Sequence, residues 1–192
     1  MAAPDTGITN SPFIGLRGFH VAKLVDDPAG GTALYEEIVS IPHIRQIDIK
    51  PQNSSATLYA DDQAVDFAST TSEYELTIST ASLPLEYKAY LLGHKLDSGV
   101  MTAGKEDVSP YFAVMFESTK KNGRKRYCKF LKVQFQEPDE SPQTKADSLQ
   151  YNTPTLVGKA IYRTSDGVAY RQADEEASGF TADMAAAWYT EV

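Results

Sequence analysis

Residues 111–135, YFAVMFESTKKNGRKRYCKFLKVQF, carry the clearest structural signal in this chain of 192 residues. The dipeptide Asn122-Gly123 stands between two runs in which apolar residues recur at every second position. Asn-Gly between alternating runs is typical of the tight turn of a β-hairpin. The sequence therefore predicts that residues 110–118 and 125–135 form two antiparallel strands.

The same two-residue period recurs along the chain and makes β-structure the dominant expectation. Apolar and polar residues alternate at 46–50 and at 74–79, and further strands are expected near 19–25 and 156–162. Such alternation is typical of strands that pack one face and leave the other in water or against another molecule. We expect residues 182–189 to include a short helix.

One longer helix is expected at about 83–92. Ser82 is placed to cap its N-terminus, Pro84 suits the first turn, and Gly93 is a natural C-terminal stop. Its apolar residues at helical spacing are Leu85, Ala89 and Leu92. The expected fold is therefore mainly β with one flanking α-helix, arranged as a β-sandwich or barrel.

Composition indicates a folded protein and limits its class. Hydrophobic residues make up 42% of the chain and aromatic residues 10%, as in a globular domain. The single cysteine, Cys128, excludes an intramolecular disulfide. We expect no signal peptide and no membrane span, because no basic patch precedes an apolar run and no long apolar window occurs. The net charge of −8 argues against a protein that binds nucleic acid.

Two polar stretches are expected to be connections rather than regular elements. Residues 52–71 contain only one short strand-like run, at 56–59, and residues 136–153 are rich in Pro, Ser, Asp and Gln. Connections of this length inside a compact domain are usually functional or disordered. The first of them is therefore a candidate for a contact with another molecule.

The chain contains no recognisable catalytic or metal-binding pattern. The histidines His20, His43 and His94 have no second histidine or cysteine at metal-ligand spacing, and His94 is expected to cap or pack. Cys128 lies in a predicted strand and is expected to be a buried, inert thiol. No G-x-S-x-G, P-loop or G-x-G-x-x-G motif occurs. We therefore predict no enzymatic activity, no cofactor and no bound metal.

The first of two charged candidates for an interface is acidic. Asp61, Asp62 and Asp66 cluster in the polar stretch 52–71, but their spacing is not that of a calcium-binding EF-hand loop. A solvated loop, or one that meets a basic partner, is the favoured interpretation.

The second candidate is the tip of the predicted hairpin, which is strongly basic. Five cations lie within seven positions, namely Lys120, Lys121, Arg124, Lys125 and Arg126. One interpretation is a solvated turn. The alternative is that this tip meets an acidic surface on a neighbouring copy of the same protein.

Four short strings occur in a fixed order, TLYADD at 57–62, LPLE at 83–86, LLGH at 91–94 and NTPTLVG at 152–158. This ordered set, within residues 14–164, resembles the major tail protein family of long-tailed phages, in particular its non-contractile siphophage members. The resemblance implies a division into a flexible N-terminal segment at 1–13, a tail-tube β-sandwich domain at 14–164 and a C-terminal arm at 165–192.

The resemblance also implies a structural role. Subunits of this family form hexameric rings whose sheets join around a lumen, and the rings stack into a tube through which the genome leaves. The string holding Thr57, Leu58, Tyr59, Asp61 and Asp62 then resembles an arm placed against a neighbouring subunit or ring. The implied partners are other copies, the tape measure protein, the tail tip and the tail terminator, in the virion tail and, during assembly, the host cytoplasm. DNA would pass without specific binding, since an acidic wall repels phosphate.

Two other function classes remain open at the level of the sequence. One is a soluble β-sandwich module that binds a ligand such as carbohydrate, for which the 11 tyrosines would supply exposed rings. The other is the tube protein of a contractile injection system, which shares the fold.

Overall fold

The computed structural model describes residues 11–60, 62–140 and 153–192. Expectations that concern residues 1–10, Asp61 and residues 141–152 lie outside the described residues. The described elements are β1 (Phe13–Asp26), β2 (Leu34–Tyr35), β3 (Val39–Ser40), β4 (Ile44–Ala60), β5 (Gln63–Thr80), α1 (Leu85–Leu92), β6 (Lys95–Asp97), β7 (Val100–Thr102), β8 (Tyr111–Lys120), β9 (Lys125–Phe135), β10 (Thr155–Ala160), β11 (Tyr170–Asp174) and α2 (Ala182–Ala187).

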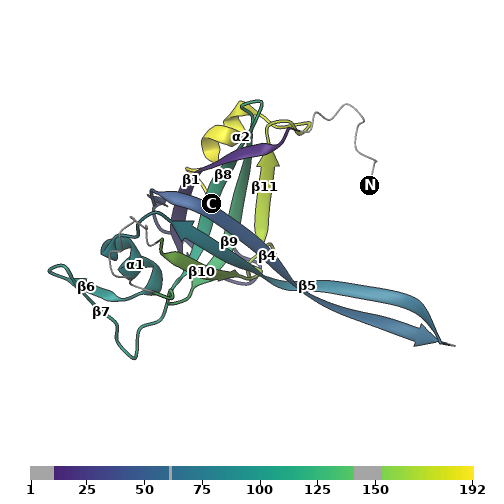
Figure 1. The fold of residues 1–192 in the computed structure, drawn as a ribbon, viewed down its shortest axis with the longest axis horizontal. Helices are drawn as coiled ribbons and strands as arrows, with labels where there is room; N and C mark the ends of the chain where they lie inside the picture. Colours follow the sequence, from purple (N-terminus) through teal and green to yellow (C-terminus); the bar gives the residue numbers. More distant parts are fainter. Residues whose placement is uncertain (1–10, 61, 141–152) are drawn as a thin grey trace, which may run out of the picture.

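One antiparallel sheet organises the molecule, with the strand order β2-β1-β8-β9-β10-β5-β4. Strand β9 changes partner along its length, because Val133–Phe135 pair with β10 whereas Arg126–Phe130 pair with β11. Figure 1 shows β1, β8, β9 and β11 standing side by side, with β10, β5 and β4 crossing in front of them. The sheet thus folds over on itself, and the expected mainly-β fold is confirmed.

The predicted hairpin is the centre of this sheet. Strands β8 and β9 pair in register from Tyr111↔Gln134 to Thr119↔Lys125. Gly123 occupies the turn with φ of 82°, a left-handed conformation that glycine adopts without a steric penalty. Residues 112–117 of β8 are all buried, so both faces of this strand are covered. The run FAVMF is therefore nearly continuous in apolar residues, as expected for a strand with two packed faces.

The two faces of β8 lie against different clusters. Phe112 and Val114 belong to the main core, together with Phe130 of β9 and Leu76 of β5. Ala113 and Met115 point to the opposite side. There they form a smaller cluster with Ala22, covered by Tyr35, Ile38, Tyr189 and Val192.

Helix α1 packs against the main core and begins later than expected. Its N-cap is Pro84, which provides no side-chain hydrogen bond, so the prediction that Ser82 caps this helix was wrong. Proline fixes a backbone angle suited to the start of a helix even without a capping oxygen. The predicted stop is confirmed, because Gly93 is left-handed with φ of 75° and its N–H bonds back to Ala89.

The expectation of a long connection at 52–71 was wrong. Residues Ile44–Ala60 and Gln63–Thr80 pair throughout as a hairpin, from Ile44↔Thr80 to Ala60↔Gln63. We call residues 52–71, the outer part of this hairpin, the arm; Figure 1 shows it extending well beyond the body of the molecule. Apolar alternation indicates a packed face, and the outer part of the arm is exposed and packs on no other element among the described residues. The Ser- and Thr-rich strands of the arm are stabilised by backbone hydrogen bonds between β4 and β5. The apolar pattern of the sequence therefore did not predict these strands.

The segment after residue 164 contributes to the same sheet. Strand β11 pairs with β9 from Tyr170↔Phe130 to Asp174↔Arg126, and α2 follows it. Tyr189 and Val192 pack on the small cluster behind β8. No helix within the described residues is long and apolar enough to cross a membrane.

Candidate functional site

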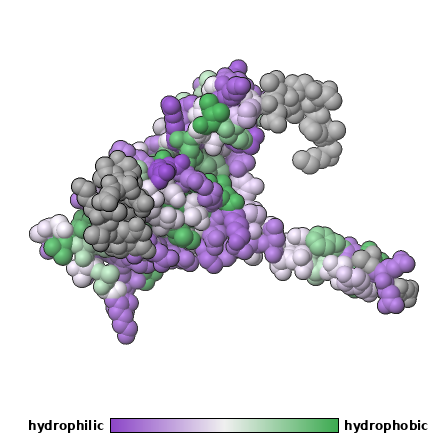
Figure 2. Space-filling model, viewed as in Figure 1, coloured by the Kyte–Doolittle hydropathy of each residue, from purple (hydrophilic) through white to green (hydrophobic). Residues whose placement is uncertain are grey.

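The arm exposes large apolar side chains at its outer end. Its exposed residues include Leu58, Tyr59, Val65 and Phe67, and the rings of Tyr59 and Phe67 are 68% and 65% exposed. Figure 2 shows apolar surface along the arm, separated from the body of the molecule. An isolated two-stranded hairpin is marginally stable in water, and clustered exposed apolar side chains mark interaction sites. The arm therefore has the properties of a segment that is completed by a partner.

Strand register sorts the outer residues of the arm onto two faces. Thr57 pairs with Phe67, and Tyr59 lies two residues further along the same strand, so these three side chains share one face. Leu58 pairs with Asp66 on the other face. Residues 52–71 include three aspartates and no lysine or arginine. The arm thus combines one aromatic face with a net negative charge.

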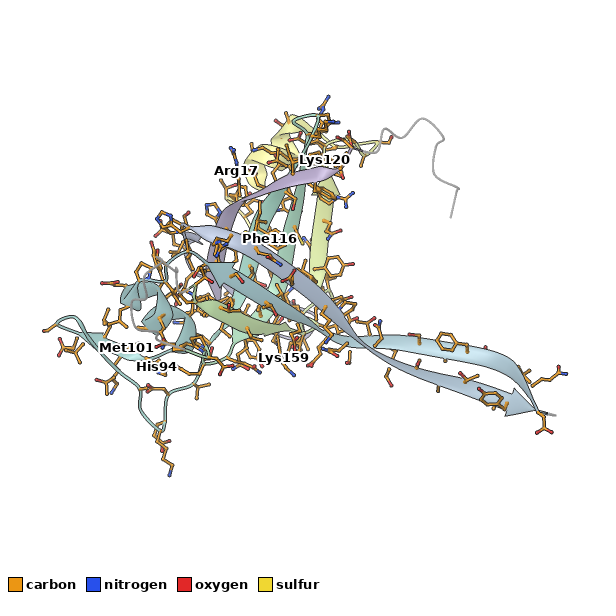
Figure 3. The ribbon with its side chains drawn as sticks, in the orientation of Figure 1. Arg17, His94, Met101, Phe116, Lys120 and Lys159 are labelled. Carbon is orange, nitrogen blue, oxygen red and sulfur yellow. The ribbon has the colours of Figure 1, made fainter. Side chains whose placement is uncertain are left out.

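The basic tip of the β8–β9 hairpin, residues 120–126, is the second candidate. It lies where β8, β9 and the C-terminal segment meet. Lys120, the last residue of β8, has a side chain that is only 4% exposed, and it donates to Asp174 at 2.7 Å and also to Glu176. Figure 3 shows Lys120 at the end of the sheet remote from His94. Burial alone would lower the pKa of Lys120, but hydrogen bonds to the two carboxylates outweigh it and raise that pKa. The charge of Lys120 is thus neutralised by carboxylates of its own subunit.

Two further tip cations are also paired inside the chain. Arg126 donates to Asp174 at 2.8 Å and lies over the ring of Phe13, and Lys125 bonds Glu117 at 2.8 Å. Lys121 and Arg124 are exposed and have no ion pair within the described part of the chain. The sequence presented five cations as one patch, whereas the fold leaves two of them facing outward. Lys120 and Arg126 are paired with Asp174, which lies 54 and 48 positions away in the sequence, so no local pattern distinguishes them from Lys121 and Arg124.

Residues 44–189 match the family model described as phage tail tube protein. The chain belongs to the phage tail tube protein family. It is a structural subunit of a tail tube, and the resemblance drawn from the four strings is confirmed. The match begins later than residue 14 and continues past residue 164, so it includes β11 and α2.

One solved structure that resembles this tail tube protein is the anti-feeding prophage cap, the terminating cap of that tube. The two are 11% identical over 88% of this chain and 96% of the cap, with a TM-score of 0.48. No curated protein matches the chain.

A second charged cluster in this tail tube subunit lies below α1 and is centred on His94 (Figure 3). Its imidazole bonds Asp107 through Nδ1 at 2.9 Å and Glu137 through Nε2 at 3.0 Å. Glu137 also bonds Lys88 of α1 at 3.2 Å. The hydrogen bonds from Glu137 and Asp107 raise the pKa of His94. The cluster ties the end of α1 to two connecting segments, a packing role rather than a catalytic geometry.

The remaining candidate groups are the cysteine and the acidic residues. Cys128 is buried, as expected, and burial raises the pKa of its thiol to about 11, which disfavours the reactive thiolate. Within residues 11–60, 62–140 and 153–192, no group of three or more His, Cys, Asp or Glu is arranged to hold a metal ion. Asp62 and Asp66 lie on the arm, and Asp61 lies outside the described residues.

Proposed function

We propose that this tail tube subunit assembles with copies of itself into hexameric rings that stack into a channel for genome delivery. The observation that carries the proposal is the arm, a long hairpin whose outer part packs on no other described element of its own chain and exposes Tyr59 and Phe67. Such a surface is stabilised when another molecule covers it. The residues proposed for this contact are Thr57, Leu58, Tyr59, Asp61 and Asp62.

Open sheet edges support the joining of subunits within a ring. Among the described strands, β4 pairs only with β5, and β11 pairs only with β9. Unpaired edges are templates for pairing with another chain, and a closed ring removes them. Because the two edges belong to different strands, their contact would be head-to-tail, the geometry that closes rings.

DNA would pass through the lumen of such a tube without binding specifically to its wall. The net charge of −8 favours a wall that repels phosphate and gains nothing from counterion release. In this proposal the subunit has no enzymatic activity and works in the virion tail after assembly in the host cytoplasm. Its further partners are the tape measure protein, the tail tip and the tail terminator. The four sequence strings favour the non-contractile type of tail.

Concentrating the purified protein tests this proposal. We expect negative-stain electron microscopy to show rings or hollow tubes of uniform width, and sedimentation velocity to show loss of the monomer as concentration rises. A chain that remains monomeric at the highest soluble concentration contradicts self-assembly. A glycan-binding screen run on the same sample addresses the ligand-binding alternative directly.

A further inference from the structure

A groove lies at the free edge of β11, under α2. It has a volume of about 440 Å³, and its walls include Gln172, Ala173, Asp174, Ser178, Phe180 and Met184. Consecutive strand residues point to opposite faces, so a hollow lined by three in succession lies at an edge of the strand. The other edge of β11 is occupied by β9. The groove therefore opens beside backbone groups that have no strand partner among the described residues.

The apolar wall of the groove is held in place. The ring of Phe180 stacks on Tyr127 of β9 with centroids 5.9 Å apart. Tyr127 also contacts Trp188 at 5.7 Å, beyond the end of α2. Met184 of α2 remains 49% exposed. A fixed aromatic ring beside an adaptable, exposed methionine is suited to receive another apolar side chain.

The mouth of the groove adjoins the hairpin tip, which adds two exposed cations beside the acidic turn that follows β11. The side chain of Asn122 bonds Glu176, and the N–H of Lys125 bonds Glu175 at 3.0 Å, which fastens the turn after β11 to the tip. The two outward-facing cations of the tip, Lys121 and Arg124, lie on either side of Asn122, whose bond to Glu176 brings the tip to the turn that borders the groove. Their charge has no ion-pair partner within the described part of the chain.

We propose that the outer end of the arm of one subunit docks in the β11 groove of another copy. The arm complements the groove, because its aromatic face with Tyr59 and Phe67 matches the apolar wall and its aspartates, with no lysine or arginine in the arm, match the two exposed cations of the tip. Docking places the rings against Phe180 and Met184, and the aspartates beside Lys121 and Arg124. The arm is itself a strand pair, so it suits the open edge of β11. This inference rests on the proposed self-assembly.

The occupant is a second copy rather than the same molecule. Figure 1 shows the arm extending away from β11 and α2, so an arm does not reach the groove of its own chain. Arm and groove are different surfaces, so each subunit gives one and receives one. Such a heterologous contact joins the β4–β5 hairpin of each subunit to β11 of the next, the head-to-tail geometry that closes a ring.

Site-specific crosslinking tests the docking. Thr57→Cys on the aromatic face of the arm is combined with Ser178→Cys at the groove, two small exposed positions that leave the apolar anchors intact. Buried Cys128 adds no background. The assembled protein is treated with a short bis-maleimide, and we expect covalent multimers on denaturing gels. The matched control joins Thr57→Cys to Thr102→Cys on β7, an exposed position outside the groove, and should remain a monomer.

The outcomes separate the two proposals. Tubes that form but give no multimers from the Thr57→Cys/Ser178→Cys chain overturn the docking and leave self-assembly standing. A wild-type chain that forms no oligomer overturns self-assembly and the docking with it.

A charge exchange provides a second, independent test. We expect Lys121→Glu with Arg124→Glu to raise the concentration needed for assembly by about tenfold, and Asp62→Lys with Asp66→Lys to do the same. All four substitutions in one chain should restore assembly, because the attraction is re-formed with opposite signs. A combined chain that assembles worse than either pair contradicts the docking.

Discussion

Lys120 at the end of β8 donates a partly buried hydrogen bond from Nζ to Oδ1 of Asp174 at the end of β11, at 2.7 Å and across 54 positions of sequence. The bond fastens the C-terminal strand to the centre of the sheet. We expect Lys120→Ala to lower the free energy of unfolding by about 2 kcal/mol, since Asp174 and Glu176 lose a partner in a partly dry site. Chemical denaturation followed by circular dichroism measures the change.

Lys121→Ala is the control for this prediction. The residue is adjacent and exposed, and we expect its replacement to change the free energy of unfolding by less than about 0.5 kcal/mol. Equal denaturation midpoints for the two variants would show that the buried ion pair adds nothing to stability.

The His94 cluster predicts a specific pH dependence. Hydrogen bonds to Glu137 and Asp107 raise the pKa of His94 above its ordinary value of 6.5, so the stabilisation from the imidazolium is complete below pH 6.5 and is lost as pH rises through the folded-state pKa. The pKa values of Asp107 and Glu137 are lowered, so their contribution is present above the ordinary carboxyl range and is lost on acidification. We expect the stability difference between wild type and His94→Gln to shrink as pH rises from 6 to 9.

Denaturation midpoints across this pH range measure the difference. His43→Asn serves as the control, because His43 is exposed and has no carboxylate partner within the described residues. A difference between wild type and His94→Gln that stays constant from pH 6 to pH 9 would falsify this account of the cluster.

Cys128 should report global unfolding. Burial leaves its thiol out of reach and raises its pKa to about 11, so little thiolate forms at pH 8. We expect no reaction with a colorimetric disulfide reagent over hours in buffer and complete reaction in denaturant. Thr57→Cys, at an exposed arm position, should react at once in the folded protein. Rapid labelling of folded wild type would show that the sheet opens locally at β9.

Gly93 should tolerate no side chain. Its φ of 75° is unfavourable for other residues, and a Cβ at this position would collide with the backbone oxygen of Val108. We expect Gly93→Ala to lower the free energy of unfolding by at least about 2 kcal/mol. Gly123 has a similar φ of 82° but open space around it, so Gly123→Ala should lose only about 1 kcal/mol. Thermal unfolding of both variants measures the two losses of stability. The loss in Gly123→Ala reports backbone strain alone, and the additional loss in Gly93→Ala reports the steric collision.

The predictable parts of the fold are those that the chain encodes locally. Asn122-Gly123 between alternating runs sufficed for the β8–β9 hairpin, and Gly93 sufficed for the end of α1. The arm was missed because its strands have no packed face to impose an apolar period. The pairing of Lys120 with Asp174 was missed because it joins distant segments, although the sequence displayed both charges. Residues 57–59 were identified as an interface candidate through family resemblance, and the fold adds that they project from the body.

Phe67 should matter for assembly and hardly at all for folding. Its ring is 65% exposed in the isolated subunit, so Phe67→Ser should leave the denaturation midpoint of the monomer almost unchanged. If a second copy covers the ring, its loss removes about 2 kcal/mol from each contact and raises the concentration needed for assembly by roughly thirtyfold. Val100→Ser on β7 is the control, because this apolar side chain is also 65% exposed but lies off the arm. Sedimentation velocity of the three proteins decides the matter: if Phe67→Ser assembles at the wild-type concentration, its ring is not part of the contact.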